Sequence, residues 1–180
     1  MAFNESRTYQ NLLAAYEAEL TITGKYEIYG DITRLEGYIE ISHFYEEFAR
    51  NNKEHARIWL RTINEGELPN TTDVLLESIQ SETSIANNMY QEFSRIAREE
   101  GYEEISSLFS GIANIDFYHT STLRSIYNDV VNDTFFCKPE ETLWICIQCG
   151  NILFRDCAPT ICPVCGFPQG YYRLYNETQY

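Results

Sequence analysis

Two Cys-x-x-Cys-Gly motifs near the C-terminus constrain this chain more than any other feature. The first begins at Cys146 and the second at Cys162, with twelve residues between the two cysteine pairs. Each motif holds two sulfur atoms close together, and the glycine lets the backbone turn so that amide N–H groups can face them. Two such turns facing each other form a tetrahedral four-sulfur site, which suits iron or zinc. The predicted metal ligands are Cys146, Cys149, Cys162 and Cys165.

The alternative for these motifs is a pair of disulfides in a secreted module. Residues 1–6 lack both the basic segment and the apolar segment of a secretion signal. We therefore expect a reducing, cytoplasmic location in which thiolates bind a metal. Cys137 and Cys157 lie outside the four-cysteine pattern, and we expect them to be inert or exposed thiols. A resolving or peroxide-sensing role is the alternative for these two.

Charge and hydropathy exclude two classes of partner. The formal net charge of −14 argues against binding to nucleic acid and to anionic membrane surfaces. No apolar run approaches the ~20 residues that a membrane-spanning helix needs. Small cysteine-bounded modules usually need their metal to fold, and Pro139 interrupts any helix just before the motifs. We therefore predict one domain over residues 1–136 and a metal-binding domain over residues 137–180.

Helical patterns dominate the predicted first domain. Glycine and N-cap signals divide it into four helices, predicted at residues 5–36, 38–63, 73–100 and 103–131. Residues 34–42 also align without a gap on residues 98–106, and only the second and sixth pairs differ. The chain therefore contains two copies of a helical hairpin, joined by a long crossover. A four-helix bundle with one long crossover has ferritin-like connectivity.

Each predicted helix carries a carboxylate, amide or imidazole on its apolar stripe, about halfway along. Buried ionisable groups without partners cost several kcal/mol, so something must compensate them. Ferritin-like di-iron proteins do this with a Glu from each of two helices and a Glu-x-x-His motif from each of the others. A buried hydrogen-bond network without metal is the alternative. The residues concerned are Glu19, Asn52, His55, Glu82, Asp116 and His119.

These features together resemble the rubrerythrin family, in which a ferritin-like di-iron bundle precedes a rubredoxin-like iron–sulfur domain. The resemblance covers nearly the whole chain. It implies a mainly α fold: a ferritin-like four-helix bundle with a small C-terminal rubredoxin-like metal-binding β domain. Apart from the two cysteine motifs, it rests on Asn11–Glu19, Lys53–Ala56, Met89–Phe93 and Ile96–Gly101.

The resemblance also implies a function. Rubrerythrins reduce hydrogen peroxide with electrons from a reductase and typically form homodimers. Iron is implied in the four-sulfur site, with zinc as the alternative, and non-haem iron is implied in the bundle, as two ions or one. By resemblance, Glu19 and Glu82 are terminal ligands, Asp116 is a bridging carboxylate, and His55 and His119 each bind one iron. Tyr26 and Tyr90 match tyrosines that hydrogen-bond around the family's metal centre, and core packing is their alternative role.

Two positions depart from the family pattern. Asn52 stands where the family has a bridging glutamate, and Ile85 stands where it has an additional glutamate. A neutral amide is a weak ligand for a hard cation, so Asn52 weakens one half of the expected site. Two further functions therefore stay open. One is a degenerate homologue that carries electrons or regulates a partner, with one metal or none in the bundle. The other is a structural protein with zinc between its cysteine motifs.

Overall fold

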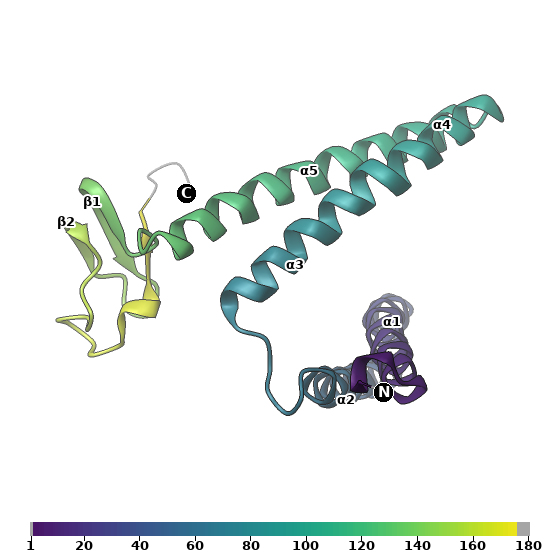
Figure 1. Ribbon diagram of the computed structural model, residues 1–180, viewed down its shortest axis with the longest axis horizontal. Helices are drawn as coiled ribbons and strands as arrows, with labels where there is room; N and C mark the ends of the chain where they lie inside the picture. The colour runs from purple at the N-terminus through teal and green to yellow at the C-terminus, as the bar shows by residue number, and fades with distance from the viewer. Residues whose placement is uncertain (1, 176–180) are drawn as a thin grey trace. The chain divides into compact units, whose positions relative to one another are not determined.

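The computed structural model describes residues 2–175 and consists of two compact units, residues 1–70 and residues 71–180. The first unit is a helical hairpin, and the second joins another helical hairpin to a small antiparallel sheet (Figure 1). None of the described helices is long and apolar enough to cross a membrane. The predicted class, mainly helical with a small C-terminal β domain, is confirmed.

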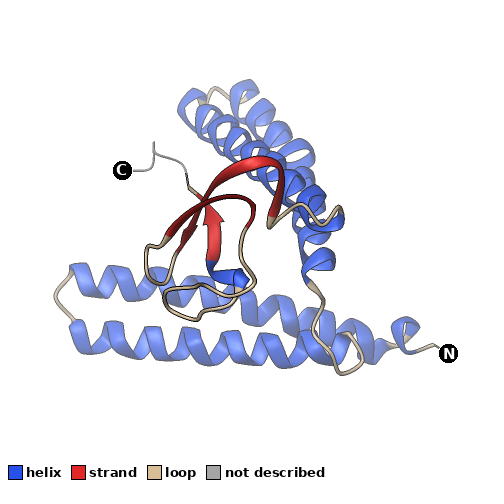
Figure 2. Ribbon diagram, turned by 90° about the vertical axis from the view of Figure 1, so that its left-hand side faces the viewer, coloured by secondary structure: helices blue, strands red, loops and turns tan. Residues whose placement is uncertain are grey.

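The first hairpin consists of α1 (Arg7–Leu35) and α2 (Ile39–Ile63), which lie side by side (Figure 2). The short 3-10 turn η1 (Phe3–Glu5) precedes it, and the Ser6 hydroxyl caps α1 by accepting a hydrogen bond from the Tyr9 N–H. Gly37, with φ of 87°, ends α1 in the left-handed conformation that favours glycine. Small side chains let the helices approach, and the buried ones on α2 are Ser42, Ala49 and Ala56.

The second hairpin pairs α5 (Glu103–Val131) with three consecutive helical segments. These segments are α3 (Thr71–Ser84), the π-helix η2 (Ile85–Tyr90) and α4 (Gln91–Glu99). The helix predicted over residues 73–100 is thus present, and a π-helical segment that the sequence did not predict lies within it. The spacing of the repeat explains the interruption: 63 residues separate Glu19 from Glu82, whereas 64 separate Tyr26 from Tyr90. The second copy carries one extra residue, and the wider turn of a π-helix accommodates it.

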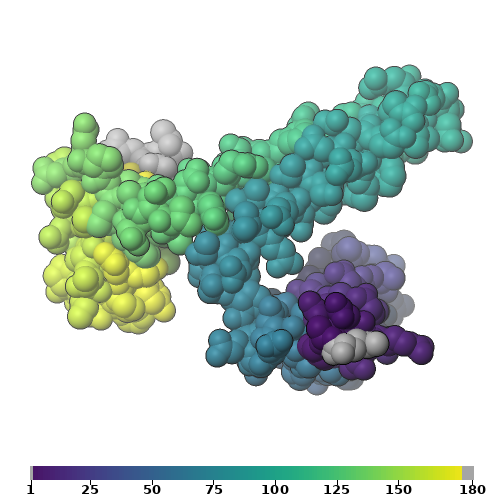
Figure 3. Space-filling view, in the orientation of Figure 1, coloured from purple at the N-terminus to yellow at the C-terminus, as the bar shows by residue number. Residues whose placement is uncertain are grey.

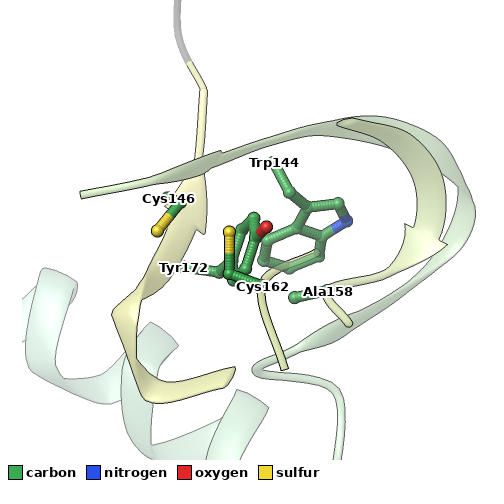
Figure 4. Packing of buried hydrophobic residues seen from close by; sticks show 5 residues of the cluster. All are labelled: Trp144, Cys146, Ala158, Cys162 and Tyr172. Carbon is green, nitrogen blue, oxygen red and sulfur yellow. The ribbon is translucent and has the colours of Figure 1, made fainter. Parts of the chain in front are cut away.

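The C-terminal β domain is a three-stranded antiparallel sheet in the order β2-β1-β3. Its strands are β1 (Cys137–Cys146), β2 (Ile152–Cys157) and β3 (Tyr172–Leu174), and the 3-10 turn η3 (Gln169–Tyr171) precedes β3. Residues 137–175 gather at the C-terminal end of α5, within the second unit (Figure 3). The core of this β domain is small, which is typical of a domain that needs a metal or cross-link. The buried residues of this core are Trp144, Cys146, Ala158, Cys162 and Tyr172 (Figure 4).

The sheet overturns one expectation about cysteine chemistry. Cys137 and Cys157, expected as free thiols, form a disulfide. They are direct partners in the ladder between β1 and β2, with Cα atoms 4.0 Å apart. Spacing alone could not reveal this pair, because it depends on the register of two strands on either side of the first cysteine motif.

The sheet begins at Cys137, where the metal-binding domain is predicted to start, and that domain boundary stays a prediction.

Candidate metal centres

The four predicted cysteine ligands converge at one end of the sheet. Cys146 ends β1, and Cys162 lies in the loop that leads to η3. The Sγ atoms of Cys146 and Cys165 are 3.8 Å apart, as are those of Cys149 and Cys162. A metal bonded tetrahedrally to four sulfurs at about 2.3 Å would place them about 3.8 Å from one another. The donor set and its spacing therefore fit a four-coordinate iron or zinc ion.

A glycine turn supports each cysteine pair. Gly150 and Gly166 have φ angles of 78° and 74°, in the left-handed region that other residues rarely adopt. The Gly150 N–H donates to the Cys146 carbonyl over 2.8 Å, and the Gly166 N–H donates to the Cys162 carbonyl over 3.0 Å. The two turns thus have matching geometry, as their shared sequence pattern predicts.

The surroundings of Cys162 and Cys165 shift the pKa values of these two thiols in opposite directions. Burial raises the pKa of Cys162, but hydrogen bonds from the Tyr172 hydroxyl and from backbone N–H groups outweigh it and lower the pKa to about 6. At Cys165 the Phe167 N–H lowers the pKa, but burial and the neighbouring cysteine thiols raise it to about 12. Thiolates this close repel one another, so they ionise together only around a cation.

Two residues beside the cysteines, Asn151 and Tyr172, were not predicted from the sequence. The Asn151 amide donates to the Tyr172 hydroxyl over 3.2 Å and lies 4.0 Å from the Cys162 sulfur. Burial first, and then its bond to Cys162, raise the pKa of Tyr172 to about 12, so it stays a hydrogen-bond donor. No motif marks Tyr172, because only the pairing of β3 with β1 brings it to the sulfurs.

The second hairpin assembles three of the predicted bundle ligands. Glu82 projects from α3, while Asp116 and His119 lie three residues apart on α5 and so share a face. One ligand atom from each lies within 4.8 Å of the others, and His119 Nδ1 is 3.6 Å from a Glu82 carboxylate oxygen. Asp116 is buried, at 9% exposure. Two carboxylates and an imidazole with this spacing fit a divalent iron ion.

The first hairpin repeats this arrangement with one substitution. His55 Nδ1 is 3.5 Å from a Glu19 carboxylate oxygen, matching the pair formed by His119 and Glu82. Asn52, three residues before His55 on α2, is half-buried where the second hairpin has Asp116. The first hairpin therefore offers one carboxylate and one imidazole, plus a neutral amide. The other departure, Ile85, is the first residue of the π-helix.

The two predicted tyrosines lie in equivalent aromatic clusters. The Tyr26 ring is 5.4 Å from that of Tyr45, and the Tyr90 ring is 5.9 Å from that of Phe109. Their packing role is thus visible in each hairpin. Their role beside a metal stays a prediction.

Comparison with known proteins decides the family. The rubrerythrin family model matches residues 10–72 and 73–143, two segments that meet close to the junction between the two units. The chain belongs to the rubrerythrin family. A rubrerythrin of Nitratidesulfovibrio vulgaris is 30% identical over 180 residues, covering 94% of each chain. Rubrerythrin-1 of Clostridium acetobutylicum is 27% identical, covering 96% of each chain.

Solved structures of nigerythrin are also similar to this chain. The partially reduced state of nigerythrin is 22% identical, covers 94% of this chain and 87% of the nigerythrin chain, and has a TM-score of 0.36. Membership of the rubrerythrin family makes this a non-haem iron protein, and its four-cysteine site is present. Among residues 2–175, the clusters that fit iron are thus the one between the cysteine turns and the one on the second hairpin.

Proposed function

We propose that this rubrerythrin-family protein reduces hydrogen peroxide at an asymmetric bundle site. One observation carries the proposal: Glu82, Asp116 and His119 present ligand atoms within 4.8 Å of one another, on the chain that also carries the four-cysteine site. A carboxylate-rich cluster and a four-sulfur cluster suit two different tasks. Iron would supply one-electron transfer at the sulfurs, and Lewis acidity with electrons for O–O cleavage at the carboxylates.

The asymmetry follows from the charges of the two hairpins. On the second hairpin, Glu82 and Asp116 supply two carboxylates and His119 supplies an imidazole nitrogen. On the first, Asn52 removes one of the charges that would attract a second cation. We therefore assign the tighter bundle site to the second hairpin. Glu19 and His55 are the ligands proposed for a second, weaker ion.

The remaining roles are also proposals. Reduction of one peroxide to two waters takes two electrons and two protons, and we propose that a reductase supplies the electrons through the four-cysteine site. We propose that Tyr26 and Tyr90 hydrogen-bond around the bundle metal. We also propose a cytoplasmic homodimer whose helical domain spans residues 1–136 and whose metal-binding domain spans residues 137–180. Zinc in the four-cysteine site would leave it redox-silent.

A second function is favoured by the two departures from the family pattern. Asn52 and Ile85 together remove two carboxylates from the expected ligand set. If the bundle holds no metal, the protein would carry electrons through its four-cysteine site alone, or act as a regulatory partner. The two functions differ in their response to peroxide.

The deciding experiment follows reoxidation of the iron-loaded protein. The protein is reduced without oxygen and mixed with hydrogen peroxide, and the return of iron–thiolate absorption is recorded by stopped flow. Loss of supporting contacts to a metal ligand costs about 10–100-fold in activity, so Asp116→Asn, which alters a ligand, should slow reoxidation at least ~100-fold. Glu77→Gln, which neutralises an exposed carboxylate on α3, is the matched control. Equal rates in the wild type and Asp116→Asn would favour the electron carrier.

A further inference from the structure

The disulfide between Cys137 and Cys157 stands apart from both metal centres. Cys137 is the first residue of β1 and Cys157 the last residue of β2, opposite each other in the ladder. The four metal-site cysteines are free of disulfides, so the chain combines thiols and a disulfide in one small domain. Neither Cys137 nor Cys157 is needed to complete a metal site. Their chemistry is therefore available for another purpose.

Cys137 is accessible from a cavity beside the sheet. This cavity has a volume of about 320 Å³ and lies between the C-terminal end of α5 and the β domain. Both cysteines are half-buried rather than enclosed in the core. Thiol–disulfide exchange requires that an attacking thiolate reach one of the sulfurs. The lining residues are Val130, Asp133, Phe135, Phe136, Cys137 and Gln169.

Contacts that do not involve sulfur hold the two cysteine backbones together. The Ala158 N–H donates to the Phe136 carbonyl over 2.8 Å, one residue beyond the disulfide on each side. Lys138 pairs with Asp129 at 2.6 Å and so fixes the start of β1 to α5. These contacts would keep the two thiols close after reduction, which favours re-formation of the same bond. The regular ladder is interrupted between Cys137 and Thr142, so opening the disulfide leaves the pairing from Thr142 to Ile145 in place.

We propose that Cys137 and Cys157 form a two-electron redox site, reduced by a dithiol and re-oxidised by hydrogen peroxide. In reduction, one thiolate of the dithiol attacks the Cys137 sulfur, and Cys157 leaves as a thiolate that takes up a proton. The second thiol of the dithiol then attacks its own mixed-disulfide sulfur, which releases Cys137 as a thiolate and the oxidised dithiol.

Re-oxidation consumes one peroxide molecule. The Cys137 thiolate attacks a peroxide oxygen and breaks the O–O bond, which gives a sulfenic acid and, with one proton, a water molecule. The Cys157 thiol then attacks the sulfenic sulfur, forms the disulfide and releases the second water. Each sulfur gives up one electron, and peroxide takes both. This site shares its oxidant with the proposed peroxide reduction but does not rest on the bundle metals.

Selective alkylation of the iron-loaded full-length protein tests the proposal. The protein is equilibrated anaerobically in buffers of reduced and oxidised dithiothreitol, labelled with N-ethylmaleimide, and mapped by peptide mass. We expect labels on Cys137 and Cys157 to rise together from none to two per chain, following a two-electron curve. The iron content of the four-cysteine site should stay constant throughout. In Cys157→Ser, Cys137 should be labelled in every buffer.

The peroxide step is tested in the dithiol-reduced protein after the dithiol is removed. One equivalent of peroxide should return the two labels to none, in the wild type and in Asp116→Asn alike. Two labels in every buffer would overturn the proposal, because the bond would never form. Absence of labels in every buffer that leaves the iron site intact would also overturn the proposal, because the disulfide would then be inert. Re-oxidation in the wild type but not in Asp116→Asn would assign the oxidation to the bundle metal instead. If peroxide fails to reoxidise the iron but still returns the two labels to none, the proposed function fails and the proposal for Cys137 and Cys157 stands.

Discussion

Gly30 on α1 packs against Ser42 on α2. The equivalent residues of the second hairpin, Ser94 and Ser106, are in contact through their hydroxyls. In the second hairpin the Ser94 and Ser106 hydroxyls are 2.9 Å apart, and each also donates to the other's backbone carbonyl. In the first hairpin the Ser42 hydroxyl is buried without a hydrogen-bond partner among residues 2–175. A β-carbon added at Gly30 would lie 3.8 Å from that hydroxyl and 3.6 Å from the Ser42 carbonyl oxygen. The first hairpin thus has only one half of the buried serine pair that the second contains.

Restoring that pair should stabilise the protein. Gly30→Ser should raise the free energy of unfolding by about 0.5 kcal/mol through helix propensity and by about 1 kcal/mol through the hydrogen bond. Urea unfolding followed by far-UV circular dichroism measures the change. Gly24→Ser on the same helix, where an added β-carbon meets nothing within 4 Å, should gain only the first contribution. Equal gains at the two positions would show that Ser42 does not use the new hydroxyl.

Tyr172 should tune the four-cysteine iron. Its hydroxyl donates to the Cys162 sulfur, and such a bond favours the more negative ferrous state. Tyr172→Phe should lower the reduction potential by about 40 mV, if the bond favours the ferrous state by about 1 kcal/mol. Potentiometric titration of the iron–thiolate absorption measures the shift. Tyr171→Phe, which alters a ring packed on Phe167, is the control and should leave the potential unchanged. An unchanged potential in Tyr172→Phe would remove this role.

Metal removal should unfold the β domain and spare the helices. The sheet has a core of five buried residues, and two of these are metal-site cysteines. Zinc-loaded Trp59→Phe leaves Trp144 as the single fluorescent tryptophan, buried at 1% exposure. Chelation in the presence of a dithiol should shift its emission to the red, while the helical signal persists. Unchanged emission would mean that the sheet holds together without metal.

The sequence predicted the parts of this protein that depend on local spacing. The cysteine turns follow from five residues each, and the pair Asp116 and His119 follows from one helical turn. Glu82 joins them because the internal repeat aligns α3 with α1. Contacts set by strand register were missed, namely the disulfide of Cys137 with Cys157 and the bond from Tyr172 to Cys162. The π-helix was also missed, although the change in repeat spacing from 63 to 64 residues indicates an inserted residue.

Asn52→Glu should strengthen the weaker half of the bundle site. The substitution returns a negative charge three residues before His55, at the position that matches Asp116 on the second hairpin. We expect one additional iron per chain relative to the wild type. Asn51→Glu adds the same charge at the exposed neighbouring position and should leave the iron content unchanged. Equal iron content in the Asn52→Glu variant and the wild type would mean that position 52 does not face the metal.

The metal content per chain tests the central claim most directly. The protein is produced anaerobically with iron supplied, and metals are counted by elemental analysis. An asymmetric site predicts about two irons per chain, one between the cysteine turns and one held by Glu82, Asp116 and His119. Asp116→Asn should then lower the count to about one. About three tightly bound irons in the wild type would contradict the asymmetry, because the first hairpin would then hold its ion as firmly as the second despite Asn52. About one iron would contradict the bundle site itself, and with it the proposed reduction of peroxide.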